Sequence, residues 1–347
     1  MVSSYLPYIA VWLTGLVITA LLCPLVYRLA TRMGVIDLPD ARKVHSDPIP
    51  RWGGVAIALS FYFTTGFALW WSLGESVSPV ARFVGGVTGA LSGAGDQLPS
   101  DLAARSTLFG LLCGGALMVL LGMVDDVLAL PAKAKLAGQI VIACVFVYFG
   151  IQISFFSHLQ HGIVYLPEWA ARVITVIWII GLTNAVNLLD GLDGLLSGVS
   201  GISAAFLCVV SLMKGQVLVA LLLAALSGSA FGFLRYNFNP ARMFMGDTGS
   251  LFLGSMFACL SIMGALKISA TLALLVPVFI MGLPIADTAW AIIRRAANGR
   301  PIFQADKEHL HHRLLSLGLS QRQAVAVIWM VNGMLGLLGV ILAYTVR

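Results

Sequence analysis

Long apolar stretches separated by short polar segments make up most of the chain. A membrane-spanning helix needs roughly 17–25 residues, and ten stretches approach that length: 6–27, 53–73, 108–124, 136–156, 173–189, 195–213, 217–234, 251–266, 270–293 and 324–346. Lipid does not tolerate unpaired backbone groups, and the in-out alternation of a membrane barrel is missing from the sequence. The pattern therefore predicts an all-α, polytopic membrane protein with about ten transmembrane helices in one domain, residues 1–347.

The composition excludes a soluble globular protein. Hydrophobic residues make up 59% of the 347 residues and charged residues only 10%, and the mean hydropathy is +0.94. Too little polar surface remains to cover a water-soluble fold of this size. The five cysteines all fall inside apolar stretches, so we expect free thiols that pack within the bundle.

The basic residues predict the orientation in the membrane. None precedes the first apolar stretch and several follow it, which is the reverse of a cleavable signal peptide. With the N-terminus outside and ten crossings, both termini are extracytoplasmic, and most Lys and Arg residues lie in cytoplasmic loops or at the inner helix ends, as the positive-inside rule requires. The net charge of +6 is mainly this orientation signal. We expect no nucleic acid partner.

Five polar segments then share the cytoplasmic face: 31–52, 125–135, 187–194, 235–250 and 294–323. They carry most of the acidic residues and every motif considered below. An error of one crossing would scatter these motifs over both faces. Their convergence therefore supports both the number of helices and a single site. The outer segment 75–107, rich in Gly and Ser, is expected to form an extracytoplasmic loop or a short surface helix.

The stretch "GMVDDVLAL" places Asp125 and Asp126 at the inner end of the third apolar stretch. Adjacent carboxylates at a helix C-terminus are opposed by each other and by the helix dipole. A nearby cation or metal ion is a simple physical reason for the pair. The alternative is two solvated carboxylates at a helix end.

The stretch "NAVNLLDGLDG" places Asp190 and Asp193 three residues apart, on one face if the turn is helical. Either aspartate can instead cap the next helix. Asn187 offers both a donor and an acceptor, and Gly191 and Gly194 allow a flat polar ligand to approach the backbone. These features favour a binding surface.

The stretch "NFNPARMFMGDTGSLFLG" begins at Asn237 and sets Asp247 between two glycines before the eighth apolar stretch. This arrangement fits a tight turn with a helix cap. It also fits a ligand for Mg²⁺, which prefers one or two carboxylates together with substrate phosphates. Phe244 either stacks on a base or fills a gap between helices.

The stretch "DKEHLHHRL" carries His309, His311, His312 and Arg313 in the last cytoplasmic loop. The spacing could suit a transition metal, but this face has no cysteine. Arginine and imidazole groups surrounded by further basic residues favour a diphosphate ligand. The alternative is a basic loop with incidental histidines. Asp287, in the ninth apolar stretch, is expected to face a cavity or to pair with a residue such as Arg294.

Carboxylates able to hold a metal and basic groups able to hold phosphates thus meet on one face. With these motifs in order over residues 32–323, the sequence resembles the polyprenyl-phosphate N-acetylhexosamine-1-phosphate transferases. Members of that family transfer a sugar-1-phosphate from a UDP-sugar to undecaprenyl or dolichyl phosphate and release UMP. The His-Leu-His-His-Arg motif looks like the bacterial branch that uses UDP-GlcNAc, because the UDP-MurNAc-pentapeptide enzymes have three consecutive histidines.

The resemblance implies roles for particular residues. The aspartates Asp125, Asp126, Asp190, Asp193 and Asp247 form the expected catalytic set, with Asp247 and Asp126 as ligands of Mg²⁺, or of Mn²⁺ in its place. The remaining expected contacts surround the uridine, the diphosphate and the sugar: Asn187, Asn237, Phe244, His309, His311, His312 and Arg313, with Lys43 and His45 from the first loop.

The implied partners are a UDP-N-acetylhexosamine, undecaprenyl phosphate and membrane lipid, and a homodimer is compatible with them. The implied location is the bacterial plasma membrane, with the active site on the cytoplasmic side. A rival function is the transport of an anionic nucleotide or phosphate compound. Transporters usually place polar residues near the middle of the membrane and show repeated halves, neither of which this sequence has. The CDP-alcohol phosphotransferases would need an Ala-Arg pair after Asp-Gly, which "DGLDGLLSG" lacks.

Overall fold

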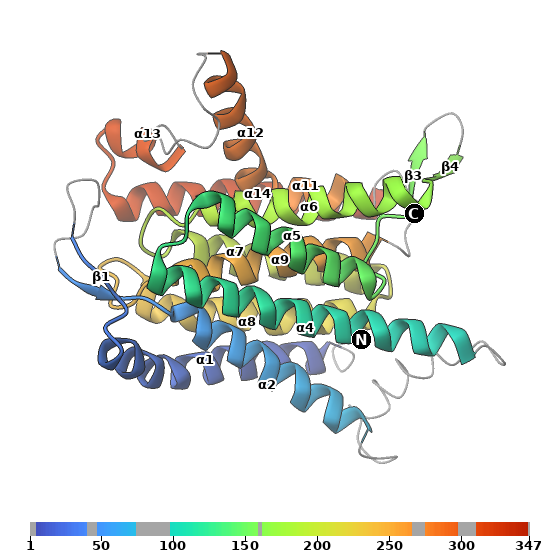
Figure 1. Cartoon of the computed structure of the whole chain (residues 1–347), viewed down its shortest axis with the longest axis horizontal. Coiled ribbons are helices and arrows are strands. Elements are labelled where there is room, and N and C mark those ends of the chain that lie inside the picture. Colours follow the sequence, from blue (N-terminus) through green and yellow to red (C-terminus); the bar gives the residue numbers. More distant parts are fainter. Residues whose placement is uncertain are drawn as a thin grey trace.

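The protein is described by a computed structural model, which covers residues 5–39, 47–73, 98–158, 162–265, 275–297 and 310–345. These residues are mostly helical (Figure 1). The helices are α1 (Leu6–Arg32), α2 (Gly53–Leu73), α4 (Leu98–Leu128), α5 (Ala132–Tyr148), α6 (Glu168–Leu188), α7 (Leu195–Met213), α8 (Val217–Asn237), α9 (Gly246–Ala265), α11 (Leu275–Ile280), α12 (Gly282–Ala297), α13 (Leu310–Ser316) and α14 (Gln321–Thr345). The strands are β1 (Ile36–Asp37), β2 (Ile49–Pro50), β3 (Phe155–His158) and β4 (Gly162–Tyr165).

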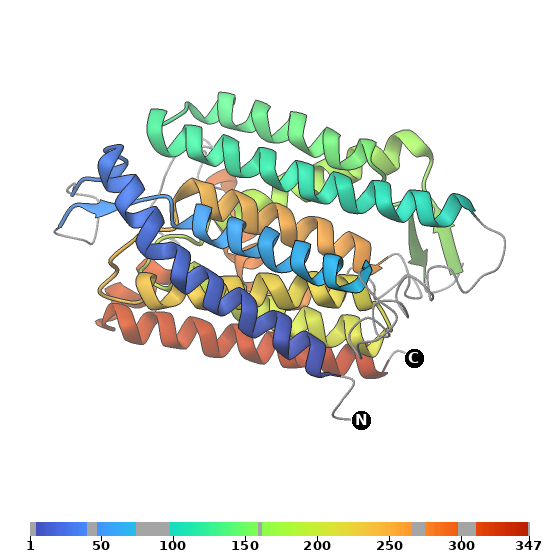
Figure 2. The same ribbon diagram turned by 90° about the horizontal axis from the view of Figure 1, so that it is seen from below.

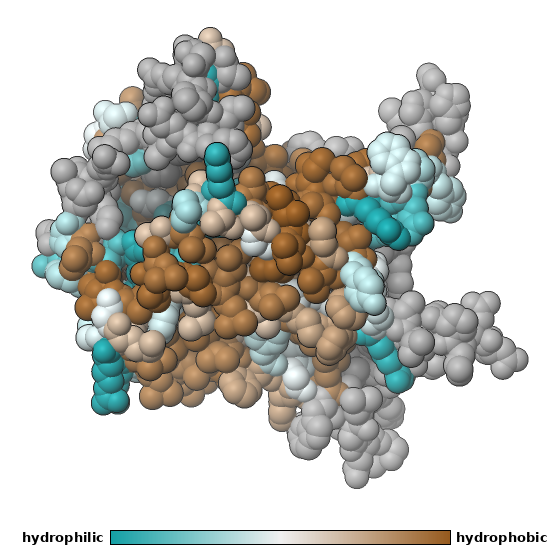
Figure 3. All heavy atoms as spheres, viewed as in Figure 1, coloured by the Kyte–Doolittle hydropathy of each residue, from teal (hydrophilic) through white to brown (hydrophobic). Residues whose placement is uncertain are grey.

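Seven of the described helices are long and apolar enough to cross a membrane: α1, α4 from Ala104, α6, α7, α8, α9 up to Gly264 and α14. The helices lie roughly along one direction (Figures 1 and 2). Figure 3 shows hydrophobic residues covering the middle of the visible face and hydrophilic residues toward its two ends. A multi-pass membrane protein is therefore confirmed. The count of ten crossings and the side on which the termini lie remain predictions.

The predicted helix 270–293 is wrong as a single helix. Among its described residues, α11 ends at Ile280, Met281 forms a turn and α12 begins at Gly282. Pro284 lacks the N–H that would continue a helix from α11, and glycine weakens a helix interior. Figure 1 shows the result, with α12 standing away from the bundle at a steep angle to α14.

The predicted helix 136–156 is too long at its C-terminal end. Helix α5 ends at Tyr148, and Gly150 follows with a φ of +93°, a conformation that favours glycine. Residues 155–158 then pair with residues 162–165 as the antiparallel hairpin β3–β4. A second small sheet pairs β1 with β2. Apolar content alone did not distinguish the residues after Tyr148, including the start of β3, from helix.

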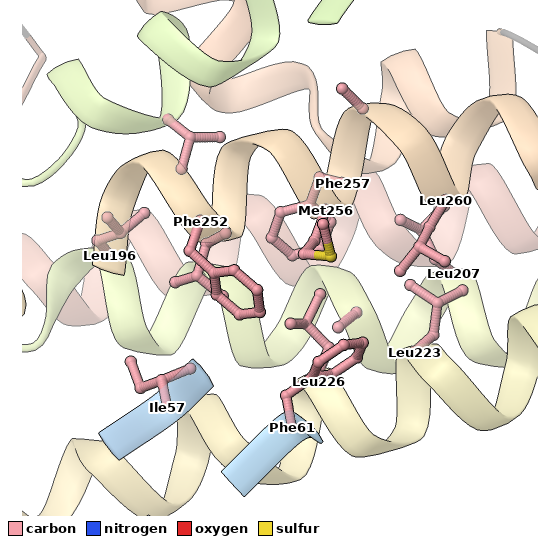
Figure 4. Packing of buried hydrophobic residues seen from close by; sticks show 14 of the residues in the cluster. Ile57, Phe61, Leu196, Leu207, Leu223, Leu226, Phe252, Met256, Phe257 and Leu260 are labelled. Atoms are coloured by element: carbon pink, nitrogen blue, oxygen red, sulfur yellow. The ribbon is translucent and has the colours of Figure 1, made fainter. Parts of the chain in front are cut away.

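Helix α9 lies at the centre of the bundle. In its most apolar window 83% of the residues are buried, against 22% for α1 and 28% for α14. Figure 4 shows Phe252, Met256 and Phe257 of α9 packed among side chains of α2, α7 and α8. This central helix carries Asp247 in its first turn.

Small residues bring α2, α4 and α6 close to α9. A Cβ atom on Gly54 of α2 would stand 2.0 Å from the backbone N of Gly249, and one on Gly122 of α4 would stand 2.4 Å from the Cα of Thr248. A Cβ on Gly254 would likewise stand 2.6 Å from the Cα of Thr183 in α6. Small residues are the usual means of close helix approach in membranes. The first two contacts flank the turn that holds Asp247.

Candidate active site

A cavity of about 470 Å³ lies at the end of the bundle that carries β1 and α13 (Figure 1). It brings together residues from all five polar segments that the sequence assigned to one face. Its lining residues are Asp37, Arg51, Asp126, Lys135, Asn187, Asp190, Gly191, Leu192, Asp193, Asn237, Phe244, Gly246, Asp247, His312 and Gln321. Eight of these were expected from the sequence, so the predicted motifs do converge on one cavity.

Asp247 is held by two donors. Its Oδ2 atom accepts from Lys135 Nζ at 2.7 Å and its Oδ1 atom from Asn187 Nδ2 at 2.6 Å. Lys135 Nζ also lies 2.9 Å from Oδ2 of Asp125. A single ammonium group thus bridges two carboxylates, and the Asp247 side chain remains 30% exposed.

Asp126 fixes the start of α9. Its carboxylate accepts hydrogen bonds from the N–H of Asp247 at 2.9 Å, the N–H of Thr248 at 3.1 Å and the Thr248 hydroxyl at 2.6 Å. A carboxylate at a helix N-terminus satisfies otherwise unpaired N–H groups and interacts favourably with the helix dipole. The Asp126 side chain is 1% exposed. Asp126 therefore orients Asp247 from the buried part of the cavity wall.

Asp125 points to the neighbouring loop and to Lys135. Its Oδ1 atom accepts from the N–H of Leu130 at 2.8 Å, just past the end of α4. The residue is 6% exposed. The cation that the sequence suggested for the Asp125–Asp126 pair is therefore present, as Lys135 on α5.

Asp190 and Asp193 lie in a turn between α6 and α7 that is not helical, so the helical-face argument does not apply to them. Asp193 accepts from Asn239 Nδ2 and from the N–H of Ala241, both at 3.0 Å, and so holds the loop that precedes α9. Asp190 lines the cavity, and its carboxylate makes no hydrogen bond or ion pair within the described residues.

The environment of Asp190 favours its neutral form. Burial raises its pKa to about 7, and the nearby carboxylates of Asp247, Asp126 and Asp193 act in the same direction, while Arg51 opposes them. A carboxyl group is more easily protonated where water is excluded and other negative charges are near. A bound cation would relieve this repulsion.

Asn237 and Phe244 are in the expected place. The Asn237 side chain accepts from the N–H of Gly194 at 3.1 Å and the Ser197 hydroxyl at 2.9 Å, and donates to the carbonyl of Met243 at 3.1 Å. Asn237 therefore ties two walls of the cavity together, as well as lining it. Phe244 lines the same cavity.

The histidine motif is described only in part. His312 lines the cavity, whereas Arg313 lines a separate cavity of about 280 Å³ beside Asp287 and Trp290. Asp287 accepts from the N–H of Leu310 at 2.9 Å and so caps α13. Lys43, His45 and His309 lie outside the described residues, as does the side chain of His311.

Two basic residues of the cavity, Lys135 and Arg51, were not predicted as site residues. Lys135 was counted only among the basic residues that indicate the orientation in the membrane, although it lies ten residues after Asp125 in the same polar segment. Arg51 forms an ion pair with Asp37 and lies 3.9 Å from Oδ1 of Asp126. Its place in "PIPRWGG", directly before the helix that packs on α9, was the available signal.

The donor atoms suit a hard cation. The described residues contain no group of three or more His, Cys, Asp or Glu side chains able to hold a metal ion. Asp247 and Asp190 offer carboxylate oxygens to the cavity. Mg²⁺ is commonly held by one or two carboxylates, with water and substrate phosphates completing the octahedron. The residues therefore fit Mg²⁺ bound together with a phosphate compound.

Comparison with known proteins places the chain among related enzymes. The sequence description of glycosyl transferase family 4 matches residues 108–265. A probable undecaprenyl-phosphate N-acetylglucosaminyl 1-phosphate transferase of Bacillus subtilis is 37% identical over 99% of this chain and 86% of its own length. A decaprenyl-phosphate N-acetylglucosaminephosphotransferase of Mycobacterium tuberculosis is 34% identical over 93% of this chain and 79% of its own.

A phospho-N-acetylmuramoyl-pentapeptide-transferase of Bacillus anthracis is 35% identical over a smaller share, 64% of this chain and 70% of its own length. The first two relatives match over nearly the whole chain, and their matched ranges include all the motifs that line the cavity. The chain belongs to the polyprenyl-phosphate N-acetylhexosamine-1-phosphate transferases.

Proposed function

We propose that the protein transfers GlcNAc-1-phosphate from UDP-GlcNAc to undecaprenyl phosphate, forming a lipid-linked diphosphate sugar and releasing UMP. The donor is water-soluble and the acceptor is anchored in lipid. The observation that carries the proposal is the cavity of carboxylates and cations at one end of an apolar helix bundle, where two such substrates can meet. The names of the Bacillus subtilis and Mycobacterium tuberculosis relatives support the sugar and the type of acceptor.

The proposed setting is the cytoplasmic side of the bacterial plasma membrane, with ten crossings and both termini outside. Cytosolic UDP-sugar then has direct access to the cavity. The distribution of basic residues in the sequence supports this orientation.

Mg²⁺ would be held by Asp247, with Asp190 as the open carboxylate on the facing turn. When bound, the metal neutralises negative charge on the donor diphosphate. Asp126 supports Asp247 through its bonds to the first turn of α9. The expectation that Asp126 itself binds the metal remains a prediction. A metal ion bound to Asp126 would have to share its carboxylate with the three hydrogen bonds that it already accepts from Asp247 and Thr248.

The acceptor needs little help to react. A phosphate monoester has a second pKa near ~6, so at neutral pH most of the lipid phosphate is already a dianion. What opposes reaction is repulsion between two phosphate groups. Lys135, Arg51 and His312 line the cavity and can offset that repulsion.

We therefore propose a single in-line displacement. An oxygen of the lipid phosphate bonds to the sugar-linked phosphorus as the bond to the bridging oxygen breaks, and UMP leaves with that oxygen. Asp125 is 6% exposed and engaged by Leu130 and Lys135, which suits a positioning residue better than a nucleophile. It keeps Lys135 between the two carboxylates.

The direct test uses protein purified in detergent with undecaprenyl phosphate, Mg²⁺ and a panel of UDP-sugars. We expect UMP release with UDP-GlcNAc that requires the lipid phosphate, and a labelled lipid product. Labelled UMP should not exchange into UDP-GlcNAc without the lipid. Lipid-independent exchange that disappears in Asp125→Asn would contradict the single displacement. Uptake of intact UDP-GlcNAc by protein-loaded vesicles, without UMP release, would favour a transporter instead.

A further inference from the structure

A second cavity of about 560 Å³ lies beside the active-site cavity, at the end of α1. The two cavities share Asp193 and Gln321 in their walls. The second cavity is otherwise formed by the last turns of α1, the residues leading into β2 and the loop between α8 and α9. The reaction proposed above does not use it.

Two arginines of this cavity have no partner in the part of the chain that the structure describes. The Arg28 and Arg242 side chains are exposed and form no ion pair or side-chain hydrogen bond within the described residues. Asp47 also lines the cavity and has an interaction elsewhere, but it forms no ion pair with either arginine. Asp193 is engaged by Asn239 and Ala241. Guanidinium groups bind phosphate oxygens in a planar, two-pronged geometry. The guanidinium groups of Arg28 and Arg242 are therefore suited to a phosphate.

The surface next to the cavity is suited to hydrocarbon. Leu21 and Leu25 of α1 are 68% and 59% exposed. They precede Arg28 by seven and three residues, so the three side chains follow one face of the helix. Tyr27 and Pro24 of the same helix also border the cavity. A ligand with a phosphate at one end and apolar chains at the other fits this arrangement, in which a cavity lined by arginines lies next to exposed leucines.

We propose that this cavity binds the headgroup of an anionic phospholipid, with the phosphate between Arg28 and Arg242 and the acyl chains along Leu21 and Leu25. Basic pockets between membrane helices are suited to such headgroups. Asp193 stands in the wall between this cavity and the active-site cavity. A reacting phosphate would have to pass that carboxylate, so the cavity favours a resident lipid over the acceptor.

The test is lipid binding to the full-length protein. Delipidated protein in a neutral detergent is titrated with dioleoylphosphatidylglycerol or dioleoylphosphatidylcholine, and bound lipid is counted by native mass spectrometry. The test variant is R28Q/R242Q. The matched control is R32Q/R235Q, which removes two exposed arginines near the same helix ends that do not line the cavity. Elution volume and melting temperature confirm that both variants are folded.

We expect the natural protein and the control to bind phosphatidylglycerol at least tenfold more tightly than phosphatidylcholine, and R28Q/R242Q to lose that preference. The proposal would be overturned if all three proteins preferred phosphatidylglycerol to phosphatidylcholine by the same factor. Displacement by undecaprenyl phosphate that R28Q/R242Q abolishes would identify an acceptor site instead. Displacement by UDP would identify a nucleotide site, and displacement by inorganic phosphate a simple anion site. Either result would also overturn the lipid assignment.

Discussion

At the scale of single residues, Lys135 is the unexpected member of the site. Its ammonium group is shared between Asp247 at 2.7 Å and Asp125 at 2.9 Å. A divalent cation binding to Asp247 has to compete with this resident charge. The measured metal affinity is therefore expected to include the free-energy cost of displacing the Lys135 ammonium group from Asp247, as well as the gain from coordination of the metal by Asp247.

We predict that Lys135→Met binds Mn²⁺ more tightly, by about tenfold, or ~1.4 kcal/mol, while losing transfer activity. Free Mn²⁺ measured by electron paramagnetic resonance, without substrates, gives the affinity. Lys133→Met, two residues earlier on the same helix, is the control. Weaker Mn²⁺ binding in Lys135→Met would mean that the lysine supports the metal site instead of competing for it.

Asp247→Asn is expected to lower transfer by at least 10²-fold, because it removes a formal charge from the proposed metal ligand with little change of shape. UMP release at saturating Mg²⁺ is the measurement. The melting temperature should fall only modestly, since the amide oxygen keeps an acceptor for Lys135 while the other donor, Asn187 Nδ2, loses its acceptor. Near-normal turnover would remove Asp247 from the site. Glu168→Gln, a change at the opposite end of α6 from Asn187, should be neutral.

Asp190 gives a pH-dependent prediction. Its pKa of about 7 lies above the ordinary value, so between these values the folded protein binds the proton more tightly than the unfolded chain. The stabilisation is therefore present at low pH and is lost as the pH rises through 7. In buffer that contains a chelator, Asp190→Asn should melt higher than the natural protein at pH 8, and the difference should shrink below pH 7 and vanish only below about pH 4, the ordinary pKa of a carboxyl group. A difference independent of pH would contradict this.

The sequence predicted these aspartates because carboxylates between apolar stretches are rare and costly. It did not predict which aspartates hold the backbone and which one faces the cavity. Asp126 and Asp193 stabilise the backbone around Asp247, while Asp190 faces the cavity. The backbone donors to Asp126 and Asp193 come from segments more than 40 residues away in the chain, and neighbouring residues do not encode those contacts.

At the scale of elements, the first turn of α9 depends on close packing. Gly246 has a φ of +72°, and a Cβ atom there would stand 2.4 Å from Oδ2 of Asp126. An alanine would therefore be strained and would displace the carboxylate that caps the helix.

Gly34 provides a matched comparison for this clash. Its φ is +70°, and a Cβ atom there would have no heavy atom of the described residues within 4 Å, its own chain neighbours aside. We predict that Gly34→Ala costs only the backbone strain, about 1 kcal/mol, whereas Gly246→Ala costs clearly more and also impairs transfer. Thermal unfolding and UMP release measure the two effects. Equal losses of stability would show that the Asp126 contact is not responsible.

Element boundaries were predictable where one apolar stretch makes one helix. Helix α7 spans residues 195–213, as expected. The prediction was wrong where an apolar stretch contains a break, at Met281 before α12 and after Tyr148. Hydropathy measures whether a residue tolerates lipid. It does not measure whether the backbone can continue a helix, which at α12 depends on Gly282 and Pro284.

At the scale of the whole molecule, the orientation is open to a direct test. In a cysteine-free background, Asp306→Cys should react with a membrane-impermeant thiol reagent only after the inner face is opened, and Gly93→Cys should react in intact cells. The prediction follows from the excess of basic residues assigned to the cytoplasmic loops. The reverse pattern would invert the topology and remove access for cytosolic UDP-sugar.

The central position of α9 has a consequence for biogenesis. Its hydropathy of 1.2 is the lowest of the seven spanning helices, and 83% of its apolar window is buried against other helices. Such a helix partitions weakly into lipid by itself and gains its stability from partners. All the helices described above as packing on it, α2, α4, α6, α7 and α8, precede it in the chain. During synthesis α9 therefore emerges after its partners, and Asp247 in its first turn reaches Asp126 and Lys135 when the helices that carry them have already been made.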